Sequence, residues 1–242
     1  WYMGEHAAQR QQEVAALRAG IDHGLTVIDT AEMYADGGAE EVVGQAIRGL
    51  RDRVVLVSKV YPWHAGKAAM HRACENSLRR LQTDYLDMYL LHWRGDIPLQ
   101  ETVEAMEKLV AEGKIRRWGV SNLDTEDMQA LWRTADGAHC ATNQVLYHLA
   151  SRGIEYDLLP WCQQHSLPVM AYCPLAQAGR LRDGLFQHSD IINMANARGI
   201  TVAQLLLAWV IRHPGVLAIP KAASIEHVVQ NAAALDIVLS GE

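Results

Sequence analysis

The sequence predicts an α/β fold, a (β/α)8 TIM barrel, from three observations. Short runs of β-branched and apolar residues alternate with longer helical patterns along the chain, and glycines or polar residues separate them. The alternation yields seven strands and eight helices with a helix first, which is the order expected of a barrel whose first strand lies upstream of Trp1. No G-x-G-x-x-G follows a predicted strand, which disfavours an open doubly wound sheet.

The predicted strands are short and rich in Val, Leu, Ile and Tyr, which suits strands buried on both faces of a parallel sheet. In chain order they cover residues 26–30, 54–60, 85–91, 116–120, 142–145, 169–172 and 216–219.

The predicted helices fill the intervals between the strands and carry apolar residues at helical spacing. In chain order they cover residues 10–23, 40–48, 66–81, 99–112, 125–135, 154–165, 202–212 and 224–234. The first precedes every strand and each of the others follows one, so the pattern is a series of βα units.

We expect residues 1–242 to form one domain, because no linker rich in Pro, Ser or Gly divides the chain. The length of 242 residues is at the short end for such a barrel. We therefore expect a fragment that lacks the first barrel strand and whose C-terminus could also be truncated.

Composition excludes several classes of protein. Hydrophobic residues make up 50% of the chain, which rules out a disordered or fibrous protein. The 22 Lys and Arg and 28 Asp and Glu give a net charge of −6 without a basic block, so nucleic acid is not an expected partner. The most apolar run, residues 202–211, is about half of the roughly 20 residues that a membrane span needs. Composition leaves the oligomeric state open.

The four cysteines lie far apart in the sequence, at Cys74, Cys140, Cys162 and Cys173. No C-x-x-C pair occurs among them, so we interpret them as free thiols. Free thiols are typical of a reducing compartment, and we therefore predict a cytoplasmic protein.

Four polar side chains are expected at the catalytic end of the barrel, where strands end and loops begin. Asp29, Lys59 and His92 end three successive predicted strands, and Tyr34 lies in the loop after the first. Neighbouring strands are about 4.8 Å apart, so these side chains can converge. Each alone has a structural explanation, such as a turn cap or a core histidine. A buried lysine, however, needs a charge partner, and Asp29 is the obvious one.

Such a group suits acid catalysis at a carbonyl. A tyrosine titrates near pH 10, so as a general acid Tyr34 gains from a cation such as Lys59, which Asp29 would keep protonated. His92 would donate a hydrogen bond to the carbonyl oxygen. No Ser or Cys is set up as a nucleophile, so a hydride from a cofactor fits the site.

The sequence resembles the aldo-keto reductase family along essentially the whole chain. The matching segments are Asp29-Thr30-Ala31-Glu32-Met33-Tyr34, Ser58-Lys59-Val60, Leu90-Leu91-His92-Trp93, Gly119-Val120-Ser121-Asn122, Asn143-Gln144, Ala171-Tyr172-Cys173-Pro174-Leu175 and Ile219-Pro220-Lys221-Ala222. Within the family the chain is most similar to bacterial methylglyoxal or aldehyde reductases.

The resemblance implies a set of roles. Tyr34 would be the general acid, Lys59 and Asp29 its tuning pair, and His92 the carbonyl-orienting group. Side chains that would hold or stack on a nicotinamide are Ser121, Asn122, Gln144 and Tyr172. Residues that would contact the rest of the nucleotide are Leu175, Lys221, Ala222, His227 and Asn231.

The resemblance also implies NADP(H) as the cofactor, with Lys221 at the 2′-phosphate. Ala222 and His227 depart from the family, which often has a hydroxyl residue and an arginine at these positions. The loop at residues 175–181 resembles the segment that folds over the pyrophosphate.

The expected substrate is a small carbonyl compound, in a pocket walled by Trp63 and Trp93, with Tyr61 nearby. No metal site is expected. Two other functions stay open: a nucleotide-binding regulatory scaffold of the same fold, and a metal-dependent barrel hydrolase. The hydrolase would call for clustered histidines, and no His-x-His occurs in the sequence.

Overall fold

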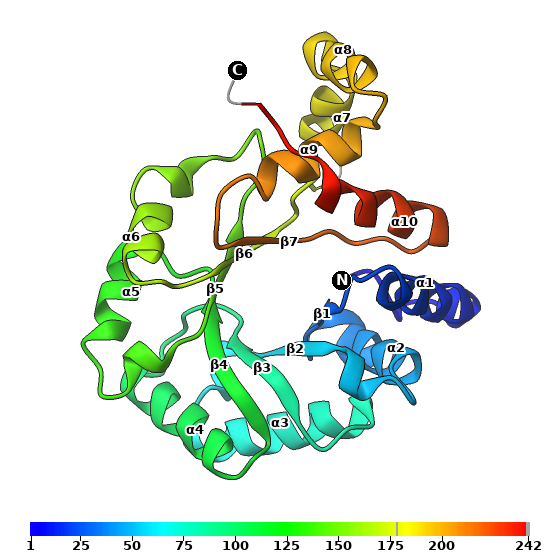
Figure 1. The fold of residues 1–242 in the computed structure, drawn as a ribbon. Helices are drawn as coiled ribbons and strands as arrows, with labels where there is room; N and C mark the ends of the chain where they lie inside the picture. The colour runs from blue at the N-terminus through cyan, green and yellow to red at the C-terminus, as the bar shows by residue number, and fades with distance from the viewer. Residues whose placement is uncertain (178, 241–242) are drawn as a thin grey trace.

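The computed structural model describes residues 1–177 and 179–240 and contains a parallel sheet of seven strands (Figure 1). The strands follow one another around a nearly closed barrel in the order of the sequence. They are β1 (Val27–Asp29), β2 (Val55–Val60), β3 (Leu86–Leu91), β4 (Ile115–Ser121), β5 (Asn143–Leu146), β6 (Val169–Tyr172) and β7 (Val216–Ile219). The predicted (β/α)8-type fold and all seven predicted strands are confirmed.

Helices lie around the outside of the sheet. They are α1 (Arg10–Asp22), α2 (Gly38–Ala46), α3 (Lys67–Leu81), α4 (Leu99–Ala111), α5 (Thr125–Trp132), α6 (Leu158–Gln164), α7 (Arg180–Gln187), α8 (Ser189–Ala197), α9 (Val202–Val210) and α10 (Ile225–Ala233). The sequence analysis predicted all of these except α7 and α8.

The predicted start of α6 at residue 154 was wrong. A short 3-10 turn, Gly153–Glu155, comes first, and the helix begins only at Leu158. The reason is a cap: the carboxylate of Asp157 accepts a hydrogen bond from the backbone N–H of Leu158 at 2.7 Å.

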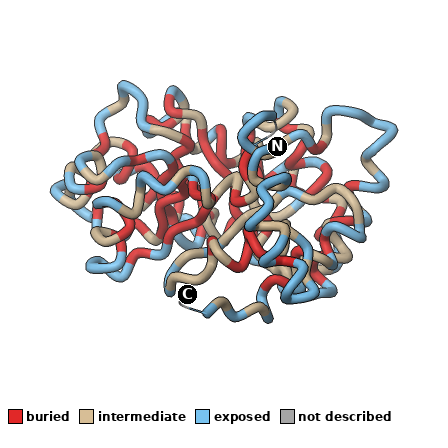
Figure 2. Tube along the Cα trace, turned by 90° about the horizontal axis from the view of Figure 1, so that it is seen from above, coloured by how far each residue is buried: buried red, intermediate tan, exposed pale blue. Residues whose placement is uncertain are grey.

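The core has three clusters. Val57, Leu90 and Met170 pack inside the barrel, and the largest cluster lies between the sheet and the helices. The third contains Tyr147, Ala171 and Val210. Figure 2 shows buried residues along the inner course of the trace and exposed residues along its outer turns. The arrangement follows from the strand pattern, because side chains alternate between the barrel interior and the helical layer.

The register of the sheet brings the carboxyl ends of the strands together. Asp29 pairs with Val57, Lys59 pairs with Leu90, and Ser121 pairs with Gln144. The side chains at the carboxyl ends of these strands, and in the loops just after them, therefore gather at one end of the barrel.

The ring is closed on one side by helices. Within the described residues, strand pairing runs from β1 to β7 and does not join β7 to β1. Instead α10 packs on α1, where Gly20 faces Val228, and Gln12 donates to the carbonyl of Ala223 at 3.1 Å. The missing strand predicted at this seam stays a prediction.

Among the described residues no single helix is long and apolar enough to cross a membrane. Only α8 and α9 taken together reach that length and composition, and they meet at an angle of 93°.

Candidate active site

Lys59 is fully buried at the end of β2 and is held by three acceptors. Its Nζ donates to Asp29 Oδ2 at 2.6 Å, to the carbonyl of Thr30 at 2.9 Å and to the hydroxyl oxygen of Tyr34 at 3.2 Å. Because the Tyr34 oxygen accepts this bond, the tyrosine keeps its own O–H for another partner.

In the ion pair Asp29–Lys59 the lysine side chain is fully buried and the aspartate side chain is 11% exposed. Burial alone would lower the pKa of Lys59, but the charges of Asp29 and Tyr34 raise it above its ordinary value. The ion pair therefore favours the charged form of Lys59 beside Tyr34.

Burial raises the pKa of Tyr34 above its ordinary value of 10, and Asp29 adds to this, whereas Lys59 acts in the opposite direction. The sequence analysis considered only the effect of Lys59. Tyr34 is thus held protonated at neutral pH, as a proton donor must be.

His92 lies beside Tyr34, with ring centroids 5.7 Å apart and the rings perpendicular. Burial, together with the charge of Lys59, lowers the pKa of His92 to about 3. The imidazole is therefore neutral at physiological pH and can donate one hydrogen bond. Its Nδ1 is buried without a hydrogen-bond partner among the described residues.

Gln144 on β5 reaches across the barrel to the same carboxylate. Its Nε2 donates to Asp29 Oδ1 at 2.8 Å, so Asp29 uses one oxygen for Gln144 and the other for Lys59. Ser121 Oγ donates to the backbone carbonyl of Gln144 at 2.8 Å. The structure thus brings two residues predicted for the nicotinamide next to the predicted catalytic group.

Asn122 and Tyr172 complete this side of the site. The Tyr172 hydroxyl donates to Asn122 Oδ1 at 2.7 Å, and Asn122 Nδ2 donates to the carbonyl of His92 at 3.1 Å. Asn122 has a φ of 60°, in the left-handed region that few residues other than glycine adopt. This backbone turn at the end of β4 aims the amide across the strand ends.

A second group of predicted residues lines a cavity of about 280 Å³ between α7, α9 and α10. Leu175, Lys221, His227 and Asn231 all line it. Ala222 lies next to Lys221 but is not among the described residues that line this cavity. The predicted loop at residues 175–181 includes residue 178, which lies outside the described residues.

The sequence analysis missed Arg182, which lines the same cavity from α7. Its guanidinium donates to the carbonyl of Leu175 at 3.2 Å and lies over the ring of Phe186, 4.3 Å from the centroid. The signal was present, because Arg182 closely follows the loop that resembles the pyrophosphate segment. None of the predicted strands and helices includes this position.

The predicted aromatic wall is present next to His92. Trp93 contacts His92, with ring centroids 4.9 Å apart, and Trp63 lies 5.8 Å from Trp93. Tyr61 stacks on Trp63 at 4.3 Å with an interplanar angle of 19°. Trp63 is 60% exposed, so most of its surface is available for contact.

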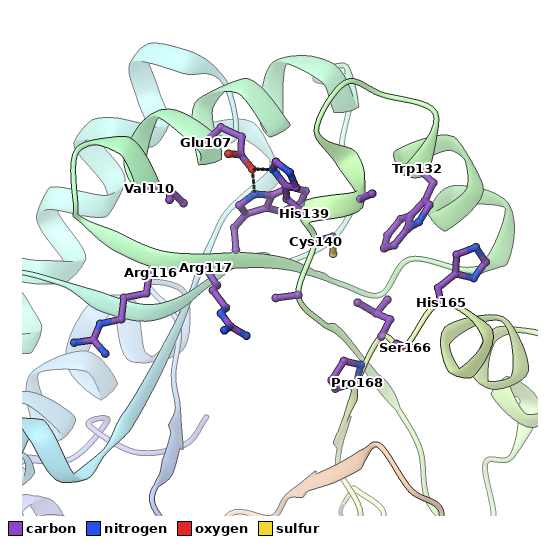
Figure 3. Close-up of a pocket in the computed structure, with 14 residues that line it drawn as sticks. Glu107, Val110, Arg116, Arg117, Trp132, His139, Cys140, His165, Ser166 and Pro168 are labelled. Atoms are coloured by element: carbon purple, nitrogen blue, oxygen red, sulfur yellow. Dashed lines mark hydrogen bonds and ion pairs between the residues drawn. The ribbon is translucent and has the colours of Figure 1, made fainter.

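A larger cavity of about 540 Å³ lies at the opposite end of the strands (Figure 3). Arg116 and Arg117 at the start of β4 line one side, and Trp132 and His165 line the other. Glu107 accepts hydrogen bonds from Trp118 Nε1 at 2.7 Å and His139 Nδ1 at 3.0 Å. In a barrel, this end serves stability, so we do not place the active site here.

Comparisons with known proteins agree with one another. A family profile described as the aldo/keto reductase family matches residues 1–242. The chain is 70% identical over 240 residues to methylglyoxal reductase YeaE of Escherichia coli (strain K12), covering 99% of this chain and 84% of that protein. It is 35% identical to a glyoxal reductase of Bacillus subtilis (strain 168), covering 94% of this chain and 79% of the relative.

A crystal structure of the thermostable aldo-keto reductase Tm1743 with the inhibitor epalrestat superposes with a TM-score of 0.90 at 37% identity. The match covers 100% of this chain and 89% of that one.

Proposed function

The chain belongs to the aldo/keto reductase family, and from this we propose that it reduces small aldehydes, with methylglyoxal as the leading substrate, at the expense of NADPH. It is an oxidoreductase that depends on a pyridine nucleotide. The observation that carries the proposal is the group Asp29–Lys59–Tyr34 around the fully buried Lys59, which lies beside the aromatic wall and shares a carboxylate with Gln144.

When bound, a reduced nicotinamide supplies a hydride to the carbonyl carbon. Tyr34 donates its proton to the carbonyl oxygen, and Lys59 stabilises the phenolate left behind. The neutral imidazole of His92 orients the carbonyl through one hydrogen bond. Asp29 keeps Lys59 charged and in place.

The residues present fit a nicotinamide. Gln144 directs Nε2 to Asp29, which leaves its Oε1 to accept from a carboxamide, and Ser121 and Asn122 lie on the adjoining strand end. Tyr172 is half-buried beside them and offers a ring face for stacking.

The preference for NADPH rests on the cavity at Lys221. Three basic side chains, Arg182, Lys221 and His227, line it, and no acidic residue does within the described part of the chain. Such a pocket suits the 2′-phosphate that distinguishes NADPH from NADH. At position 227 this chain has a histidine, where the family often has an arginine. Arg182 supplies a cation to the same cavity.

The choice of small aldehydes rests on the wall and on the relatives. Trp63 and Trp93 offer apolar faces close to His92, which suits a compact carbonyl compound. Two relatives carry the names methylglyoxal reductase and glyoxal reductase.

We also propose that the enzyme acts in the cytoplasm. Cys74, Cys140 and Cys162 are buried as free thiols, and Cys173 is a half-buried one. Burial raises the pKa of Cys74 to about 12, so this thiol is unreactive. Thiols of this kind are usual in a reducing compartment.

The experiment measures dissociation constants of NADPH and NADH by nucleotide fluorescence, and NADPH oxidation with methylglyoxal by absorbance. Wild type should oxidise NADPH. Lys221→Ala should weaken NADPH binding by about 10- to 100-fold, the value of a charged hydrogen bond, with little change for NADH. The matched control is Lys108→Ala, because Lys108 is 67% exposed on α4.

Equal loss of NADH and NADPH affinity in Lys221→Ala would show that Lys221 does not recognise the 2′-phosphate. A wild-type enzyme that oxidises neither nucleotide with any small aldehyde would overturn the reductase function and favour the regulatory scaffold. Partner capture with and without nucleotide then tests that alternative.

A further inference from the structure

Glu32 is a buried carboxylate that the mechanism above does not use. It is only 8% exposed and lies two residues before Tyr34. One of its oxygens, Oε1, accepts the backbone N–H of Tyr61 at 2.7 Å and Nδ1 of His64 at 3.1 Å. Its own backbone N–H points to the carbonyl of Lys59 at 3.4 Å.

These bonds join two segments that meet at the active site. The segment with Glu32 carries Tyr34, the proposed proton donor. The segment at residues 61–64 carries Trp63, the exposed part of the aromatic wall. Within the second segment a 3-10 turn, Pro62–His64, sets the direction of Trp63. Tyr61 directly precedes this turn as its N-cap residue, and its backbone N–H is the one that Glu32 holds.

Trp63 depends on this anchorage more than a core residue would. Its side chain is 60% exposed, and its closest aromatic contact is the stack on Tyr61. A buried side chain is held by neighbours on all sides, whereas an exposed one follows the backbone that carries it. A shift of the 61–64 segment therefore changes the distance from Trp63 to Trp93 and His92.

We propose that Glu32 is a positioning residue for the substrate: by holding Tyr61 and His64, it sets the separation between the Trp63 wall and the Tyr34–His92 pair, and so decides how large a carbonyl substituent is accepted. The inference rests on the proposed reduction of aldehydes at this site. Glu32 touches neither substrate nor cofactor in this account. It acts through the aromatic segment.

The test compares two aldehydes that differ in size, methylglyoxal and phenylglyoxal, with saturating NADPH. In Glu32→Ala the KM for phenylglyoxal should rise by about tenfold, as for loss of a hydrogen bond to a charged group, while kcat and the KM for methylglyoxal change far less. Glu32→Gln keeps a side-chain oxygen that can accept from Tyr61, so it should restore most of the loss. Glu126→Ala, an exposed position on α5, is the matched control.

A second measurement does not depend on turnover. Binding of benzyl alcohol, followed by tryptophan fluorescence, should weaken in Glu32→Ala and recover in Glu32→Gln, with the affinity for NADPH unchanged. If Glu32→Ala does not fold, His64→Ala carries the test, because His64 is partly exposed and supplies one of the two bonds. It should show a smaller change of the same sign.

A merely structural role would lower kcat/KM equally for both aldehydes, and that outcome would overturn the proposal. An unchanged ratio of the two KM values in both Glu32→Ala and His64→Ala would do the same. Failure of the proposed function looks different, because then wild type reduces neither aldehyde.

Discussion

Asp29 is the residue that links the side chains proposed for proton donation to those proposed to bind the nicotinamide amide. One carboxylate oxygen holds Lys59 and the other holds Gln144. A change at either partner therefore acts on the other through this one carboxylate. The resemblance supplied both residues from their motifs. It could not supply their contact, since Asp29 and Gln144 are 115 positions apart and meet only through the curvature of the barrel.

Tyr34→Phe should lower turnover by about 10² or more, because a positioned general acid is typically worth that much. Lys59 still finds Asp29 and Thr30, so the buried ion pair survives the substitution. The measurement is kcat with a small aldehyde, alongside the NADPH dissociation constant, which should be unchanged. Tyr156→Phe is the control, at a side chain that is 95% exposed. Near wild-type turnover in Tyr34→Phe would remove Tyr34 from the role of acid.

At the scale of elements, α2, α3 and β2 are joined by one buried carboxylate. Glu40 on α2 accepts from Arg80 Nε on α3 at 2.6 Å and from Ser58 Oγ on β2 at 2.6 Å. Gly44 lets the two helices approach closely, since a Cβ there would lie 2.6 Å from the carbonyl of Arg80. Ser58 precedes Lys59, so this joint also holds the strand end that carries Lys59.

Arg80→Met should destabilise the protein by roughly 3 kcal/mol, at the low end for a broken buried pair, because Arg80 is itself 26% exposed. The cost arises from Glu40, which is fully buried and would lose its charge partner. Urea denaturation gives the free energy of unfolding. Glu40→Gln in the same background should recover part of the loss, because a neutral amide is cheaper to bury. A loss below about 1 kcal/mol would place this pair among ordinary surface ion pairs.

Two helices, α7 and α8, could not be predicted from the sequence because they bury almost no side chains. None of the residues of α7 is buried, and α8 buries only Ala195. Helix prediction from sequence depends on an apolar stripe that faces a core, and these two helices have almost no core to face. The predicted helices, by contrast, cover the sheet, so each carries an apolar stripe that the sequence shows. Arg182 went unnoticed for the same reason.

For the molecule as a whole, a polar cluster around Glu155 joins the segment at residues 147–155 to Arg212, which lies 57 residues further along the chain. Glu155 accepts from Tyr147 at 2.6 Å, from Arg152 at 2.7 Å and from Arg212 at 2.9 Å. Burial alone would raise the pKa of Glu155, but these three donors lower it to about 2. The pKa of a glutamate in an unfolded chain is about 4.3, so Glu155 binds a proton less readily in the folded state.

This difference predicts a loss of stability in acid. The contribution of Glu155 to the free energy of unfolding is fully present above about pH 5. It disappears as the pH falls toward 2, because Glu155 is protonated more easily in the unfolded chain. Thermal unfolding at pH 7 and pH 3.5 should show a smaller drop in Tm for Glu155→Gln than for wild type. Asp84→Asn, at an exposed position with no ion pair within the described residues, is the control. Equal drops in all three proteins would mean that Glu155 is not a source of acid sensitivity.

The strand order, which equals the order of the sequence, has a consequence for how the enzyme is made. On the ribosome each new strand emerges to find its neighbour already synthesised, so the sheet can grow at one edge without waiting for distant chain. Asp29, Tyr34, Lys59 and His92 are all translated before the chain reaches β4. Lys221 and His227 emerge only after all seven strands, and His227 lies on α10, the helix that packs on α1. The residues that we propose for proton transfer are thus translated before those that we propose for the 2′-phosphate, and the part of the chain that carries the second group also brings α10 onto α1.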